Sequence, residues 1–175
     1  MRNSIRFAAA ALAAVSFAAT AQAATTAVGT ATAEVLSTLT VTPDADLRFG
    51  QIAANGGGTI VIPANSASAI TTTGTLVSTG TRGAAQFTVA GNVGVRVSLT
   101  SLSVTSPLTW QGTWTGGGAT PTMALSALTS QWDNNVDTLD AAGEAVFNVG
   151  GTLGVAANQA PGVYSGTFSV AVEYQ

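Results

Sequence analysis

An acidic segment, DNNVDTLDAAGE at residues 133–144, is the densest group of side chains that could bind a ligand. The residues that match positions 1, 3, 5 and 12 of an EF-hand calcium loop are Asp133, Asn135, Asp137 and Glu144. Position 6 of such a loop is glycine, whereas this segment has Thr138 there, and its flanks do not have the pattern of helices. We therefore expect a solvated acidic loop, and we expect no metal and no cofactor.

The chain lacks the side chains on which most catalytic sites depend. It has no His, no Cys and no Lys, and therefore no imidazole base, no thiolate nucleophile and no Schiff-base amine. Paired carboxylates can hydrolyse glycosides, but the candidate pairs, Asp44 with Asp46 and Asp133 with Asp137, fall in predicted loops. We expect no catalytic residue and predict that the protein is not an enzyme.

Two tryptophans offer another kind of chemistry, the stacking of aromatic faces on sugar rings. In TWQGTWTGGG, Trp110 and Trp114 fall on the same side of an extended segment beside a glycine run. A glycan-binding surface and a packed core or interface give the same pattern. We favour packing, because large aromatic side chains dominate cores and interfaces.

The first residues have the pattern of a secretory signal peptide, residues 1–23. A basic start, MRNSIR, precedes an apolar run, and the small-x-small sequence AQA ends at Ala23. The apolar run from Phe7 to Thr20 is too short to span a bilayer, and no later stretch is apolar enough. We expect an exported protein that does not insert into the membrane.

The chain that remains after residue 23 is acidic. Three arginines, Arg48, Arg82 and Arg96, stand against eight carboxylates. Three scattered arginines cannot build a basic patch, so we expect no nucleic-acid partner. Without cysteine no disulfide can form, and stability must come from packing or from a partner.

Short β-type runs separated by glycine-rich breakers fill the rest of the chain. The runs are STLTVT, LRFGQI, GTIVI, AQFTVAG, VGVRVSL, TMALSAL, AVFNVGGTLGV and VYSGTFSVAVEY, and the breakers are residues 54–58, 115–118, 133–135 and 158–162. This pattern predicts an all-β sandwich that forms one domain over residues 37–175. The Thr/Ser-rich residues 66–81 are expected to be a partly stranded loop.

The last run alternates with a period of two almost to the end of the chain. The face of this strand that carries the large apolar side chains comprises Tyr164, Gly166, Phe168, Val170, Val172 and Tyr174, and the polar face comprises Ser165, Thr167, Ser169, Ala171 and Glu173. Only Val163, on the polar side, departs from the pattern. We expect a half-buried strand that reaches the C-terminus.

The segment after the signal peptide, residues 24–36, alternates more weakly. One face carries Ala27, Gly29, Ala31, Ala33 and Val35. Such small side chains suit a strand that enters a preformed slot better than one that builds its own sheet. A disordered terminus would give the same weak pattern, and the sequence leaves both interpretations open.

The last strand resembles that of chaperone–usher pilus subunits, which carry a penultimate Tyr and a Gly fourteen residues from the end. Tyr174 and Gly162 occupy these positions here. The resemblance implies an incomplete immunoglobulin-like sandwich that lacks its final strand. A periplasmic chaperone fills the gap first, and the N-terminal extension of another subunit then replaces it. Residues 24–36 are then the candidate donor strand, and the last strand is the partner-binding edge.

A second resemblance covers most of the chain. The pieces LRFGQI, AAQFTVAGNVGVRVSL and FNVGGTLGVAANQAPGVYSGTFSVAVEY are similar to a proteobacterial secreted family, domain of unknown function 4402, which is associated with neighbouring pilus chaperone and usher genes. Together the resemblances imply a fimbrial subunit at the cell surface, whose partners are copies of itself or related subunits, the chaperone and the outer-membrane usher. The alternative is a self-complete secreted sandwich that binds glycan or another surface ligand.

Overall fold

The computed structural model describes residues 26–175, and the compact body of the chain runs from Val35 to Gln175. The expected signal peptide, residues 1–23, and the first two residues of the candidate donor segment lie outside the described residues. Residues 26–39 form no strand, and residues 26–38 are exposed. The segment 24–36, as far as it is described, therefore pairs with no strand in this structure.

The body is all-β, as the sequence predicts, and residues 26–175 contain no α-helix. Its elements are β1 (Thr40–Ala45), β2 (Gln51–Ala54), β3 (Gly58–Ile62), β4 (Thr71–Thr72), β5 (Leu76–Thr79), β6 (Ala85–Ala90), β7 (Arg96–Trp110), β8 (Thr122–Ser130), the 3-10 turn η1 (Asp133–Asn135), β9 (Val136–Thr138), β10 (Glu144–Val155) and β11 (Tyr164–Tyr174). Residues 66–81 are a partly stranded loop that carries β4 and β5, as expected. The strand β7 continues to Trp110, well beyond the run VGVRVSL that indicated it.

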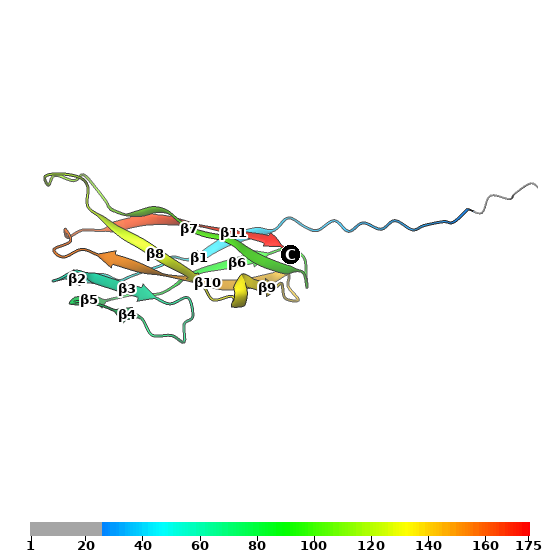
Figure 1. Cartoon of the computed structure of the whole chain (residues 1–175), viewed down its shortest axis with the longest axis horizontal. Helices are drawn as coiled ribbons and strands as arrows, with labels where there is room; N and C mark the ends of the chain where they lie inside the picture. Colours follow the sequence, from blue (N-terminus) through cyan, green and yellow to red (C-terminus); the bar gives the residue numbers. More distant parts are fainter. Residues whose placement is uncertain (1–25) are drawn as a thin grey trace, which may run out of the picture. The chain divides into compact units, whose positions relative to one another are not determined.

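The strands form open sheets, an arrangement consistent with a β-sandwich (Figure 1). In one layer β1, β6 and β10 lie side by side; the second half of β10 pairs with β3 on one edge and with β8 on the other. In the facing layer β7 pairs along its length with β11 and, at its start, with β9. The β7–β8 hairpin joins the layers, and β2 with β5 forms a separate two-stranded ribbon.

The core lies in two hydrophobic clusters between these elements. In the first, Phe147 of β10 is fully buried and its ring stacks on Phe87 of β6, with ring centroids 5.4 Å apart. Phe168 of β11 meets Phe87 edge to face at 5.9 Å and thereby ties the two layers together. In the second cluster, Ile60, Leu125 and Leu153 are grouped with Leu76 of β5. Burial of these side chains is the main stabilising term.

The turn that leads into β10 is fixed by Asp140. Its carboxylate accepts hydrogen bonds from the backbone N–H groups of Glu144, at 3.0 Å, and of Ala142, at 2.8 Å. These donors favour the charged carboxylate, so the pKa of Asp140 lies below its ordinary value of 3.8. Asp140 therefore has a structural role within the acidic segment, because its hydrogen bonds fix the turn that precedes β10.

A search of residues 26–175 for a helix long and apolar enough to cross a membrane finds none.

Candidate strand-docking groove

The C-terminal strand β11 has an open edge. It pairs antiparallel with β7 from Tyr164 to Tyr174, and none of the other strands described pairs with its second edge. The expected alternation is present: the side chains facing the core are half-buried, and Ser165, Thr167, Ser169, Ala171 and Glu173 are exposed. No side chain of β11 is fully buried. A strand whose inner face is only half covered, and whose edge is unpaired, presents backbone N–H and C=O groups with which a further strand could pair.

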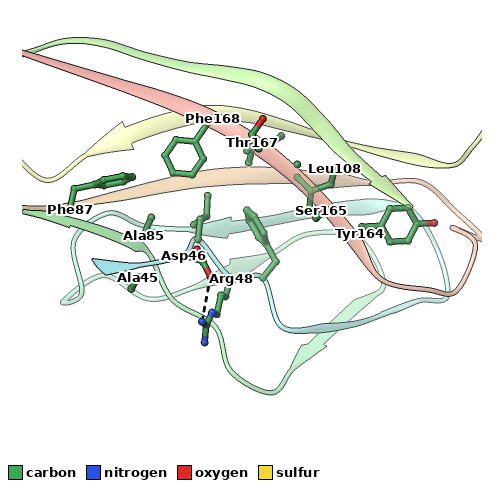
Figure 2. A pocket seen from close by; sticks show the side chains of 14 residues that line it. Ala45, Asp46, Arg48, Ala85, Phe87, Leu108, Tyr164, Ser165, Thr167 and Phe168 are labelled. Carbon is green, nitrogen blue, oxygen red and sulfur yellow. Dashed lines mark ion pairs between the residues drawn. The ribbon is translucent and has the colours of Figure 1, made fainter. Parts of the chain in front are cut away.

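A groove lies against the first half of β11 (Figure 2). One wall is β11 from Tyr164 to Phe168, and the opposite wall is the segment from Ala45 to Phe49 that follows β1. The floor is mainly apolar and is formed by Ala85, Phe87, Leu108 and Leu125. The cavity measures about 510 Å³. Its walls come from residues far apart in the sequence, and the floor comes from the hydrophobic core itself.

The groove continues past Tyr164 toward the β2–β5 ribbon. A second cavity of about 760 Å³ lies between residues 47–55 and residues 159–164, over Met123, Leu153 and Val155. It shares Leu47, Arg48, Phe49, Leu108 and Tyr164 with the first cavity. The two cavities are therefore neighbours along the same wall, and together they are called the groove.

The two outer strands of the body differ in how their edges are protected. Along β1, which pairs only with β6 among the described strands, Pro43 and Asp44 interrupt the edge. Proline cannot donate a ladder hydrogen bond, and charge discourages pairing with another chain. From Tyr164 to Tyr174, β11 carries no proline and a single charge, Glu173. Pro43 and Asp44 therefore disfavour the pairing of another strand with β1, whereas no proline disfavours pairing with β11 from Tyr164 to Tyr174.

Gly162 lines the second cavity, at a position that favours glycine. Its φ is +152°, a conformation that favours glycine, and a Cβ at this position would overlap the indole of Trp110. The Trp110 Nε1–H donates to Pro161 O at 3.1 Å. The glycine expected from its distance to the C-terminus is thus held by a tryptophan of β7.

The tryptophan pair packs within the protein. Trp110 and Trp114 meet edge to face, with centroids 5.6 Å apart and ring planes at 67°, and both are partly buried. The two rings therefore do not present two parallel faces to one ligand. The packing role favoured from the sequence accounts for Trp110, whose ring covers Gly162.

The groove mouth carries the one ion pair of the described chain. Arg48 and Asp46 lie 3.5 Å apart and both side chains are exposed (Figure 2). Exposed pairs of this kind contribute little to stability, so we expect this pair to add little to the stability of the groove wall. In the described part of the chain, no cluster of three or more acidic side chains is placed to hold a metal ion.

The structure brings together only some of the residues singled out from the sequence. Gly162, Tyr164, Gly166 and Phe168 line the groove. The others on that face of β11, Val170, Val172 and Tyr174, pack against the first core cluster. The candidate donor residues Ala27, Gly29, Ala31, Ala33 and Val35 are all exposed, and Val35 is 91% exposed.

Sequence reasoning missed the opposite wall. Leu47 and Phe49 contribute apolar side chains to it, and Ile52 and Ala54 of β2 extend it. The alternation of Leu47 and Phe49 in LRFGQI was a signal of an inward face. Which strand that face would meet depended on the topology, which the local pattern does not contain.

Fold and groove together define an all-β domain with open sheets and an unpaired C-terminal edge strand. A family model described as "Domain of unknown function (DUF4402)" matches residues 39–174, and the chain belongs to this family. The match covers every strand from β1 to β11, including both walls of the groove. A search of curated proteins found no match. A search of solved structures found none either.

Proposed function

We propose that this protein is a structural subunit of a surface fibre, assembled by donor-strand complementation. In this proposal the extension at residues 24–36 of one copy enters the groove of another and pairs with β11. A periplasmic chaperone and an outer-membrane usher hold and deliver the subunit after export. The observation that carries the proposal is the groove itself, because it combines an apolar floor with an unpaired strand edge.

The length of the extension supports this assignment. A strand rises about 3.3 Å per residue, so residues 24–36 span about 43 Å when extended. The groove strand β11 has 11 residues and is shorter than the extension at the same rise. One extension is therefore long enough to pair with β11 from end to end.

The chemistry of the extension supports it as well. Val35, on the face that also carries Ala27, Gly29, Ala31 and Ala33, is 91% exposed, so its apolar side chain is covered by none of the described residues. Full burial of a valine stabilises an assembly by about 1.5 kcal/mol or more. The backbone groups along residues 26–38 would at the same time gain ladder partners from the open edge of β11.

The experiment is a comparison of unboiled and boiled samples on a denaturing gel. The full chain is expressed with and without the chaperone and usher of its own organism, and a matched chain lacks residues 24–36. We expect a ladder of oligomers that collapses only on boiling, and we expect the shortened chain to fold but give no ladder.

A single folded monomer in every arm would contradict the proposal. A shortened chain that is destabilised as a monomer would show that the segment pairs within its own domain. Either result would favour a self-complete sandwich that binds a surface ligand, and glycans would then be screened against Trp110 and Trp114.

A further inference from the structure

Three residues meet at the end of β11 that lies away from the groove. Tyr174 Oη donates a hydrogen bond to Ser37 O at 3.0 Å and accepts one from the backbone N–H of Asn92 at 2.9 Å. Asn92 Oδ1 in turn accepts from the backbone N–H of Ser37 at 2.7 Å. Both backbone polar groups of Ser37 are therefore engaged, one by each partner. We call Ser37, Asn92 and Tyr174 the clamp.

The surroundings of the clamp are shaped to receive it. A Cβ at Gly91 would overlap both Tyr174 Oη and Leu39 Cδ1, so glycine leaves the space that the hydroxyl occupies. The backbone N–H of Gln175 donates to Arg96 O at 2.9 Å, which extends the pairing of the chain with β7 one residue past Tyr174. The penultimate tyrosine thus has a defined task in this chain, which is to hold Ser37.

The position of the clamp decides where the extension joins the body. β1 starts beside the clamp, where Thr40 pairs with Ala90, and runs toward the groove wall that begins at Ala45. The extension therefore joins the body at the end of β11 opposite the groove walls. To enter its own groove, the chain would have to reverse between the extension and β1.

The residues at that point are poorly suited to a reversal. Residues 35–39 read VLSTL and contain no Gly, Pro, Asn or Asp, and Ser37 is the only one of the five whose type favours tight turns. Ser37 stands in the middle of this stretch, and the clamp holds its N–H and its C=O. A hairpin through Ser37 would have to break these bonds first.

We propose that the clamp commits the extension to a second copy of the chain, because it blocks the reversal that self-insertion requires. This inference rests on the proposed function, since it assumes that the extension enters a groove. The inference goes beyond the proposed function because it names the residues that decide between self-insertion and exchange, which are Tyr174, Asn92 and Ser37. The extension therefore enters the groove of another copy of the chain. The clamp, which selects that partner, lies at the end of β11 away from the groove.

The test uses cross-linking, which is clean here because the chain contains no cysteine. Thr32→Cys is combined with Ser169→Cys, which lies near the middle of β11, so a paired extension brings the two sites close whichever way it runs. A short bismaleimide then gives a cross-linked monomer for self-insertion and cross-linked oligomers for exchange. The pair is made in the otherwise unchanged full chain, with Tyr174→Phe, and with Thr100→Val.

Thr100→Val is the matched control. Thr100 Oγ1 also donates to a backbone carbonyl, Ala171 O of β11 at 3.3 Å, and Thr100 belongs neither to the groove lining nor to the clamp. We expect oligomer cross-links in the unchanged chain, and a share of monomer cross-link that is about two- to tenfold higher in Tyr174→Phe, because the hydrogen bond that holds Ser37 O is lost. Thr100→Val should leave that share unchanged.

A second variant keeps the test decisive should Tyr174→Phe fail to fold. Leu36→Asn with Ser37→Gly places an Asn-Gly turn where the reversal must occur, and should make the monomer cross-link dominant. Hydrogen exchange of the Ser37 amide gives an independent measure of the clamp, and should be about two- to tenfold faster in Tyr174→Phe.

The outcomes separate the clamp from the proposed function. Equal monomer shares in Tyr174→Phe and the unchanged chain would overturn the clamp and leave strand exchange intact. Dominant monomer cross-links in the unchanged chain would overturn the clamp, because the extension would then enter its own groove. An absence of both cross-links would overturn the proposed function and the inference that rests on it, whatever the exchange rate of the Ser37 amide.

Discussion

Strands β10 and β11 are built from similar sequence patterns and reach different degrees of burial. On β10 the inward side chains Phe147, Val149 and Leu153 are at most 1% exposed. On β11 the corresponding side chains, such as Phe168 and Val170, are only half-buried. β10 has strands on both edges, whereas β11 has one neighbour among the described strands.

The difference shows that burial here is set by neighbours more than by the strand itself. An alternating strand supplies an apolar face, but a full core also needs a strand on each side to close over that face. β11 has the face and lacks one of the two neighbours. In our account the missing neighbour is a strand from another copy, so assembly should make β11 resemble β10.

The largest effect should come from truncating a buried side chain of β10, the strand that has neighbours on both edges. Phe147→Ala leaves a cavity in a fully buried site and should lower the free energy of unfolding of the single chain by about 3–5 kcal/mol. Urea unfolding measures it, with Val146→Ala on the exposed face of β10 as the control. A loss below about 1 kcal/mol would contradict the view that β10 is the centre of the core.

The next effect should depend on assembly. Phe168→Ala in the single chain should cost about 1–2 kcal/mol, because its side chain is only half-buried. In oligomers the same change should approach the cost at Phe147, since a donated strand would cover the ring. The costs of Phe168→Ala in the two states are compared by urea unfolding of the monomer and of the oligomer, with Ser169→Ala as the control. Equal costs in both states would mean that no strand covers Phe168.

A smaller effect is expected at the end of the groove. Gly162→Ala forces a side chain into the indole of Trp110 at a φ that disfavours it, and should cost about 1–2 kcal/mol. Gly117→Ala is the control, because a Cβ there meets nothing within 4 Å. The two variants are compared by thermal unfolding. A neutral Gly162→Ala would show that the tryptophan does not depend on this glycine.

The smallest effect concerns the turn before β10 and depends on pH. The folded-state pKa of Asp140 is lowered by the N–H groups of Glu144 and Ala142, so the carboxylate stabilises the fold above its unfolded pKa of about 3.8. This contribution is lost as the pH falls through the folded pKa. Asp140→Asn should therefore remove part of the loss of stability below about pH 4.

Urea midpoints from pH 2 to 7 measure this dependence, and Asp137→Asn is the control. Parallel pH profiles for the unchanged chain and Asp140→Asn would contradict the assigned hydrogen bonds.

The sequence predicts the strands better than their partners. The alternation from Tyr164 to Tyr174 predicts which side chains of β11 face inward. The four breakers lie between β2 and β3, β7 and β8, β8 and β9, and β10 and β11. These are local signals, because side chains alternate with a fixed period along a strand. The all-β class followed from them and is confirmed. The family followed from the resemblance of longer sequence pieces and is also confirmed.

The groove could be predicted on one side only. Its β11 wall was expected, whereas the wall at Leu47 and Phe49 depends on how β1 crosses the body. The bonds of Tyr174 to Ser37 and Asn92 join residues far apart in the sequence, and no pattern within either segment points to the other. Long-range pairing of this kind is a property of the topology, which one sequence does not specify locally.

The most direct test of the account is hydrogen exchange along β11 before and after assembly. The monomer that lacks residues 24–36 is compared with oligomers of the full chain, and the amides of β10 serve as the internal reference. We predict that β11 amides facing the open edge exchange fast in the monomer and become as protected as those of β10 in the oligomer. Unchanged exchange along β11 in a stable oligomer would contradict the claim that a donated strand completes this edge.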